Sequence, residues 1–284
     1  MKPYKVSKTQ MLFFIMLICF AFTSEQVLGG AWTQKKGKGY YKVDFRYLGG
    51  NKWYNSDGIK IPIPDFKDVT VGVFGSYGIT EDLTGIVGAS LFKSISLDST
   101  SSFAGSDPDV KGFGDVNLGL KCGLAHLGCT VLSAKLILGL PTGKSTPDGG
   151  LWTGNSDFSQ TIGTEIGHSF YPALVYLSGG ISYTNRSKGF SDEFRYALEG
   201  GYKFFKNLSL IVRIHSLISV KNGNENVKGG FGIFSNNQQY FAYNAELVYN
   251  VTDIIGLKAY YESGGAGKNI TSAPVLNAGI FFTY

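Results

Sequence analysis

The sequence predicts an all-β protein, a transmembrane antiparallel β-barrel of twelve strands. Apolar and polar side chains alternate along twelve segments of about ten residues, as in strands that have one apolar and one polar face. The connections between these segments alternate between long and short. No apolar run of about 18 residues follows residue 31, so no membrane-spanning helix is expected there. A closed barrel is the sheet that crosses lipid without unpaired backbone groups.

The N-terminal segment is expected to be a secretory signal peptide that covers residues 1–24. It carries three lysines and then an apolar run over residues 11–22, which is too short to span a membrane. Cleavage is expected between residues 24 and 31. Residues 32–284 are then expected to form a single barrel domain.

The predicted strands occupy most of the remaining chain. Their approximate ranges are 38–48, 68–79, 83–94, 113–122, 129–140, 156–167, 173–184, 192–203, 207–220, 238–251, 254–263 and 276–284. The long connections cover about 49–67, 95–112, 141–155, 221–237 and 264–272. With an even number of strands both chain ends lie on the periplasmic side, so the short turns are expected there and the long connections outside the cell.

The last strand places apolar residues on one face and ends on an aromatic residue. This face consists of Leu276, Ala278, Ile280, Phe282 and Tyr284. It resembles the C-terminal signal strand of bacterial outer-membrane barrels, which the barrel-assembly machinery recognises and which closes the barrel against the first strand. The resemblance implies this machinery and outer-membrane lipid as partners. A soluble edge strand could show the same alternation, but it would be an unprotected edge.

The charge balance excludes one class of function. Three of the 26 basic residues lie in the expected signal peptide, which leaves 23 basic against 21 acidic residues. Nucleic-acid binding therefore has no electrostatic support. No phosphate-binding glycine loop and no metal-ligand spacing are found, so neither a cofactor nor a metal is predicted.

Charged residues on the polar face are expected to line the lumen as ion pairs, because a charge facing lipid at mid-membrane costs about 2–4 kcal/mol. The candidate lumen residues are Lys42, Asp44, Arg46, Asp115, Lys121, Lys135, Glu165, Arg195, Glu199, Lys203, Arg213, His215, Glu246, Lys258 and Glu262. They either fill the barrel or line a polar path, and twelve strands favour a narrow or partly plugged passage. Their near balance of charge argues against strong selection of anions or cations.

Four motifs carry a resemblance to a known family. Residues 114–121 (GDVNLGLK) precede residues 138–143 (LGLPTG) and 153–158 (TGNSDF), and residues 77–83 (YGITEDL) fit the same pattern. Their order resembles the outer-membrane barrels called the "meta-pathway phenol degradation" family, described as transporters. The resemblance covers most of the mature chain and implies passive transport of small solutes, with hydrophobic or aromatic solutes suggested by the family's name.

Two other functions stay open. One is a non-conducting surface barrel whose extracellular loops bind a partner. The other, less favoured, is an outer-membrane hydrolase. His126 and His168 lie at or beside predicted turns, and His215 shares a strand face with Ser209 and Ser219. An inward histidine among charged neighbours is more often part of a filling network, so no catalytic residue is predicted.

Two further features concern cysteines and isoleucines. Cys122 and Cys129 flank a short turn but fall on opposite strand faces, so the sequence leaves open whether they form a disulfide. In the connection 49–67, Ile59, Ile61 and Ile63 are expected to pack, because leaving them in water forgoes about 2 kcal/mol each. They either pack against neighbouring loops or fold inward to form an apolar entry for solutes.

Overall fold

The computed structural model describes residues 30–98, 109–146 and 150–284, and the expected signal peptide lies outside these ranges. The regular elements in this part of the chain are β-strands. No membrane-spanning helix is found within these ranges.

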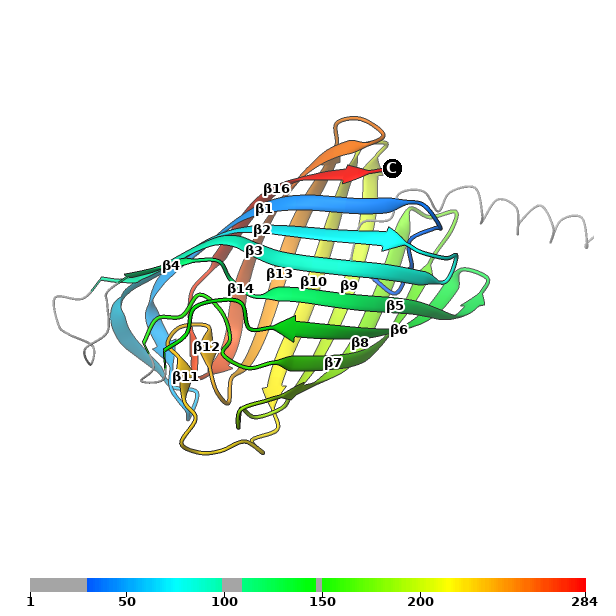
Figure 1. The fold of residues 1–284 in the computed structure, drawn as a ribbon. Helices are drawn as coiled ribbons and strands as arrows, with labels where there is room; N and C mark the ends of the chain where they lie inside the picture. Colours follow the sequence, from blue (N-terminus) through cyan, green and yellow to red (C-terminus); the bar gives the residue numbers. More distant parts are fainter. Residues whose placement is uncertain (1–29, 99–108, 147–149) are drawn as a thin grey trace, which may run out of the picture.

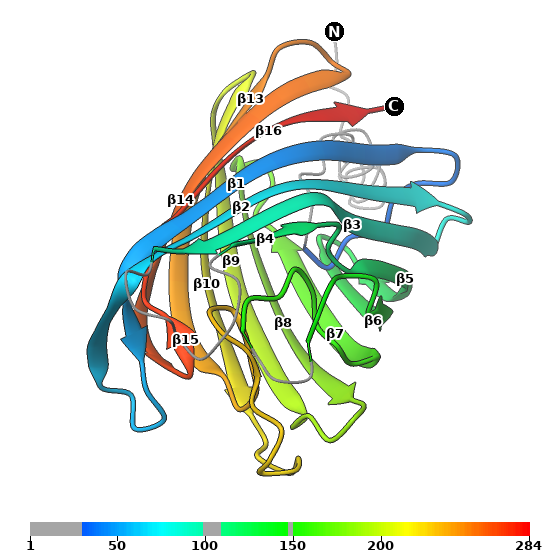
Figure 2. The same ribbon diagram turned by 60° about the vertical axis from the view of Figure 1, so that its left-hand side comes forward.

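Twelve strands of the described chain close into one antiparallel barrel (Figures 1 and 2). β1 (Gly39–Tyr54) pairs with β2 (Lys60–Gly78) on one side and with β16 (Val275–Thr283) on the other, which closes the ring. The other barrel strands are β3 (Leu83–Leu97), β5 (Val116–Leu127), β6 (Thr130–Leu140), β7 (Ser159–Ser169), β8 (Val175–Arg186), β9 (Glu193–Phe205), β10 (Leu208–Ser219), β13 (Gln239–Asn250) and β14 (Ile255–Lys268). The predicted barrel and its closure by the C-terminal strand are confirmed.

The outer surface of the barrel is apolar. Exposed residues from around the ring include Leu118, Leu136, Ile162, Ile181, Leu198, Val212, Leu257 and Ile280. Aromatic residues lie near both ends of the strands: Tyr41 stacks on Tyr284 at one end, and Tyr183 contacts Phe194 at the other, with ring centroids 5.9 and 5.0 Å apart. An exposed apolar band of this extent is unfavourable in water, whereas a lipid bilayer with aromatic girdles accommodates it.

The two ends of the barrel differ in their connections. At the end that carries the C-terminus, here called the turn end, short turns join the strands, as in residues 79–82, 128–129 and 206–207. At the opposite end, called the loop end, the long connections carry β4 (Asp109–Gly112), β11 (Gly229–Gly230), β12 (Phe234–Ser235) and β15 (Ile270–Thr271). Figure 1 shows β4, β11 and β12 gathered there. The predicted sorting of short and long connections is thus present in the fold.

The prediction that residues 49–67 form a loop was wrong. β1 continues to Tyr54 and β2 begins at Lys60, so the two strands extend as a hairpin with Trp53 opposite Ile61. Its turn is built by Asn55, whose Oδ1 accepts hydrogen bonds from the backbone N–H groups of Asp57 and Ile59. Asn-Ser-Asp-Gly between two segments of alternating side chains is a sequence typical of a β-hairpin turn. The hairpin extends the sheet beyond the predicted ends of the two strands.

The three isoleucines of this segment therefore have different environments. Ile59 and Ile61 are exposed, whereas Ile63 packs against the apolar cluster inside the loop end. A shared inward-folding entry made by all three is excluded by this hairpin.

Cys122 and Cys129 are not joined by a disulfide. Cys122 lies opposite Ala134 within the β5–β6 ladder, and Cys129 is the second residue of the turn formed by residues 128–129. Cys122 precedes the end of β5 by five residues, which is about 16 Å along a strand and beyond the reach of a disulfide.

Candidate functional site

The barrel lumen contains a belt of ion pairs, and Arg213 occupies its largest network. Its guanidinium group donates to Glu199 through Nε and to Glu246 through Nη1, the second at 2.8 Å. Lys258 Nζ lies 3.7 Å from Glu246 and 3.6 Å from Asp44. These residues come from strands β1, β9, β10, β13 and β14, so the pairs join side chains across a large part of the inner wall.

Two smaller networks share one arrangement, in which an acid in the wall is held by two bases. Glu165 lies between Lys121 and Lys135, at N–O distances of 2.6 and 2.5 Å. Asp68 lies between Arg46 and Lys93, at 3.3 and 3.0 Å. Buried carboxylates need such partners, because an unpaired buried charge is strongly destabilising.

Apolar layers cover the belt on both sides. Toward the turn end, the inward residues that pack together are Tyr40, Phe74, Ile211, Val248 and Phe281. Phe281 faces Gly256 across the β14–β16 ladder, and a Cβ at Gly256 would lie 2.0 Å from its ring. Glycine at this position therefore leaves the space that the Phe281 ring fills.

Toward the loop end, the apolar layer combines strand residues with an inward-folded connection. The buried members are Leu48, Phe66, Ile95, Leu97, Leu151 and Val275. The β11–β12 hairpin brings Phe231 onto this layer, where it stacks on Trp53 with ring centroids 4.7 Å apart. The hairpin thus covers part of the barrel mouth.

The segment that precedes β1 also enters the barrel. The carbonyl oxygen of Gly30 accepts a hydrogen bond of 2.7 Å from Lys121, and Trp32 packs edge-on against Tyr176. Further along, the backbone N–H of Gln34 donates to Thr84. Residues 30–34 therefore run from β5 and β8 toward β3 and narrow the lumen near the turn end.

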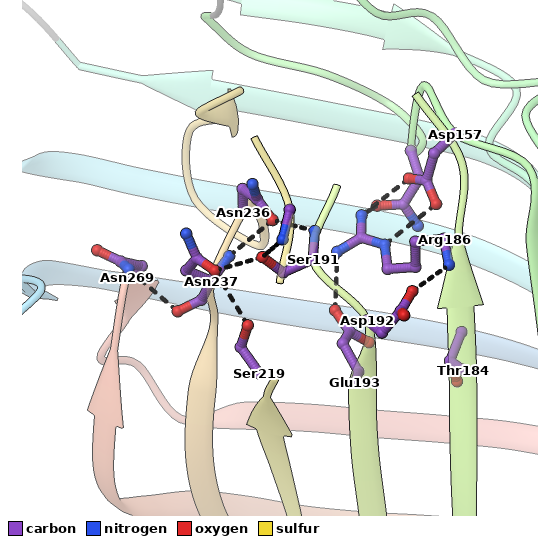
Figure 3. A network of polar contacts seen from close by, with 12 residues as sticks. Asp157, Thr184, Arg186, Ser191, Asp192, Glu193, Ser219, Asn236, Asn237 and Asn269 are labelled. Carbon is purple, nitrogen blue, oxygen red and sulfur yellow. Dashed lines mark hydrogen bonds and ion pairs between the residues drawn. The ribbon is translucent and has the colours of Figure 1, made fainter. Parts of the chain in front are cut away.

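A second polar network holds the connections at the loop end, and Figure 3 shows it from close by. Arg186, only 8% exposed, makes two hydrogen bonds to Asp157, donates to Glu193 at 2.8 Å and lies over the Phe190 ring. Two hydrogen bonds to one carboxylate fix both distance and orientation. Arg186 therefore ties the connection before β7 to the start of β9.

Asp192, in the connection before β9, lies next to the contacts of Arg186 and links further residues of the same network. It accepts hydrogen bonds from Tyr183, Asn222 and the backbone N–H of Arg186. Burial alone would raise the pKa of Asp192, but these hydrogen bonds outweigh burial and lower that pKa below its ordinary value. The carboxylate form is thus the one that joins the connections of β8–β9 and β10–β13.

Three of the motifs behind the family resemblance meet at a single point beside this network. Asp115 accepts hydrogen bonds from the backbone N–H groups of Gly143 and Asn155, at 3.0 and 2.5 Å. A Cβ at Gly154 would lie 2.1 Å from the Asp115 carboxylate, so glycine is required there. Asp115 precedes β5 and anchors connections, which differs from its predicted place in the lumen wall.

The other predicted lumen residues lie on barrel strands, on the face opposite the apolar one. Sequence reasoning missed Asp68, Lys93, Glu193 and Tyr176, all of which contribute to the networks. Asp68 alternates with outward Val69 and could have been found. Lys93 could not, because both faces of its segment are largely apolar or small.

The histidines do not form a catalytic arrangement with the candidate serines. His215 lies 3.7 Å from Glu262, and its ring meets the Tyr240 ring edge-on. The hydroxyl of Ser219 is directed to Asn237 instead. His126 and His168 lie at the turn end, beside Asp82 and Thr130 respectively.

Comparison with solved structures supports the barrel architecture. An outer membrane channel from Pseudomonas putida F1 superposes with a TM-score of 0.70 at 16% sequence identity, over 92% of this chain and 100% of that chain. The NanC porin superposes with a TM-score of 0.51 at 9% identity, over 84% and 98% of the two chains. No protein-family model matches the sequence, and no curated protein matches it either. At these identities the likeness confirms the fold expected from the resemblance.

Proposed function

We propose that this barrel lies in the bacterial outer membrane and lets small solutes cross it passively. The apolar outer band suits lipid, and the C-terminal strand, with Phe282 and Tyr284 facing outward, suits recognition by the barrel-assembly machinery. The two superposed structures, one an outer membrane channel and one a porin, support the same assignment.

The main support for the proposal is that solvent reaches charged side chains inside the barrel. Arg195 lies on the inner face of β9, yet half of its side chain is exposed to solvent. Arg46 and His215 are also partly exposed on the inner face. Ion pairs that only filled the barrel would exclude water from these groups, so the belt supports a polar path.

The proposed path is narrow, because the segment 30–34 and the β11–β12 hairpin occupy its two ends. Phe66 is fully buried, but Phe231 and Ile233 in the same layer are partly exposed and offer a surface for solutes with an apolar part. This agrees with the hydrophobic or aromatic solutes that the family resemblance implies.

Solute flux into liposomes tests the proposal. Liposomes that contain the purified barrel should admit a small solute such as glycine, whereas protein-free liposomes should not. Absence of flux would favour the alternative of a non-conducting barrel whose extracellular loops bind a partner. Release of fatty acids from the liposome lipid would instead support a hydrolase, which the arrangement around His215 disfavours.

A further inference from the structure

In the ion pairs of three lumen arginines, the base is more exposed to solvent than the acid. In the pair Arg195–Glu193 the side chains are 50% and 5% exposed, and in Arg46–Asp68 they are 26% and 0% exposed. Arg213 is 20% exposed, whereas its partner Glu246 is 2% exposed. In each pair the acid is part of the wall and the base meets the water.

Side-chain length explains this asymmetry. Aspartate and glutamate have short stems, so their carboxylates stay near the backbone of the strand. Arginine and lysine have long stems that pass over the wall and carry the charge into water. Among the lysines, Lys135 is more exposed than its partner Glu165. Lys121 and Lys258 are buried and do not share the asymmetry, so it is a property of the arginine pairs.

Two of the exposed bases lie beside one another in the lumen wall. On the paired strands β9 and β10, His215 lies between the levels of Arg213 and Arg195, and its ring meets the Tyr240 ring edge-on. Glu262 is the acid that opposes them in this region, with 21% of its side chain exposed. The carboxylates paired with Arg46, Arg195 and Arg213 stay in the wall, so a solute in the lumen touches more guanidinium groups than carboxylates.

Arg46 and Arg195 also keep hydrogen-bonding capacity. Among the described residues, Arg46 donates one hydrogen bond, to Asp68, and Arg195 donates one, to Glu193. A guanidinium group has five N–H donors in a planar fork that matches a carboxylate. The remaining donors of both groups can therefore face a solute.

We infer that the passage selects anions and takes small carboxylates, with Arg46 and Arg195 as the residues that determine this selectivity. The inference rests on the proposed channel function and specifies its solute class. It replaces the expectation from residue counts that the lumen discriminates little between anions and cations.

Two substitutions can remove these charges without leaving buried acids unpaired. After Arg46→Gln, Asp68 still pairs with Lys93 at 3.0 Å. After Arg195→Gln, Glu193 still pairs with Arg186 at 2.8 Å. A matched control, Lys60→Gln with Lys111→Gln, removes the same amount of charge from the exposed hairpin of β1 and β2 and from the loop-end strand β4.

Reversal potentials in planar bilayers under a potassium chloride gradient, and then a potassium acetate gradient, test the inference. The unaltered barrel should pass chloride and acetate in preference to potassium. The R46Q/R195Q variant should lose this preference severalfold, and the K60Q/K111Q control should keep it. Current that prefers potassium would overturn the inference of anion selection. An anion preference that is unchanged in R46Q/R195Q would overturn the assignment of this selectivity to Arg46 and Arg195. Either result leaves the channel proposal intact. Absence of any current would overturn the channel proposal itself.

Discussion

Arg186 is the single residue on which the loop end depends most directly, because it is buried and holds two carboxylates. Arg186→Met would leave Asp157 without its partner, and breaking a buried pair in this way costs about 3–5 kcal/mol. We expect the free energy of unfolding, measured in detergent with a chemical denaturant, to fall by that amount.

Arg195→Met is the matched control for this prediction. Arg195 shares the partner Glu193 with Arg186 but is half exposed, so its removal should cost no more than about 1 kcal/mol. If both variants lose the same free energy of unfolding, burial does not determine how much these ion pairs stabilise the barrel.

Asp192 predicts how the loop end responds to acid. Its folded pKa lies below the unfolded value, so its hydrogen bonds add stability above the unfolded pKa of about 3.9, and this contribution is lost as the pH falls through the folded pKa. Hydrogen exchange of residues 187–192, corrected for intrinsic rates, should therefore stay slow at about pH 4 and rise only at lower pH.

The variant Asp192→Asn checks the cause of this response. An amide cannot supply the ionised acceptor, so residues 187–192 should exchange faster than in the unaltered chain at neutral pH and show little further change on acidification. Slow hydrogen exchange in this variant at neutral pH would mean that contacts other than those of Asp192 hold residues 187–192 in place.

At the scale of elements, the β11–β12 hairpin is the feature that most restricts the mouth. Phe231 stacks on Trp53 and meets Phe66 edge-on, so Phe231→Ser should release the hairpin from the apolar layer. We expect a higher single-channel conductance in this variant. Ile59→Ser, at an exposed position of the neighbouring hairpin, should leave the conductance unchanged. A conductance that rises equally in both would place the restriction elsewhere.

Alternation within the chain predicted the barrel strands well, because the period-two pattern is local and lipid enforces it on every strand. Connections were predicted poorly, because their structure depends on distant residues. Nothing local in residues 229–235 indicates that Phe231 lies on Trp53. The inward face of the segment that carries Lys93 could not be identified from the sequence either. Glycine, alanine and serine replace the polar residues that usually identify an inward face.

In the lumen, the direction of a side chain could be predicted from the sequence, but its exposure could not. The sequence identified Arg213, Glu246 and Lys258 as inward residues from their alternation alone. It did not show which of them remain exposed, because exposure depends on how side chains from different strands cover one another. The charge that a solute meets is therefore a property of the folded barrel and not of its composition.

At the scale of the whole molecule, closure of the sheet by β1 and β16 predicts resistance to detergent. Every barrel strand is paired on both sides, so the unheated protein should stay folded in dodecyl sulfate and migrate differently from the boiled protein on a gel. Substituting Phe282 and Tyr284 by Ser, on the outward face of the closing strand, should lower the folded fraction recovered from membranes. Identical migration before and after boiling would contradict a closed barrel.

Ionic current through single molecules of the purified barrel in a planar bilayer is the most direct test for a water-filled passage. The folded state of the same sample is first established by its gel migration and its strand-dominated circular dichroism. Stepwise currents of small amplitude are expected, because water reaches the inward arginines while residues 30–34 and the β11–β12 hairpin narrow the path. If the folded, inserted barrel carries no current, even with Phe231→Ser, then no passage for ions crosses it.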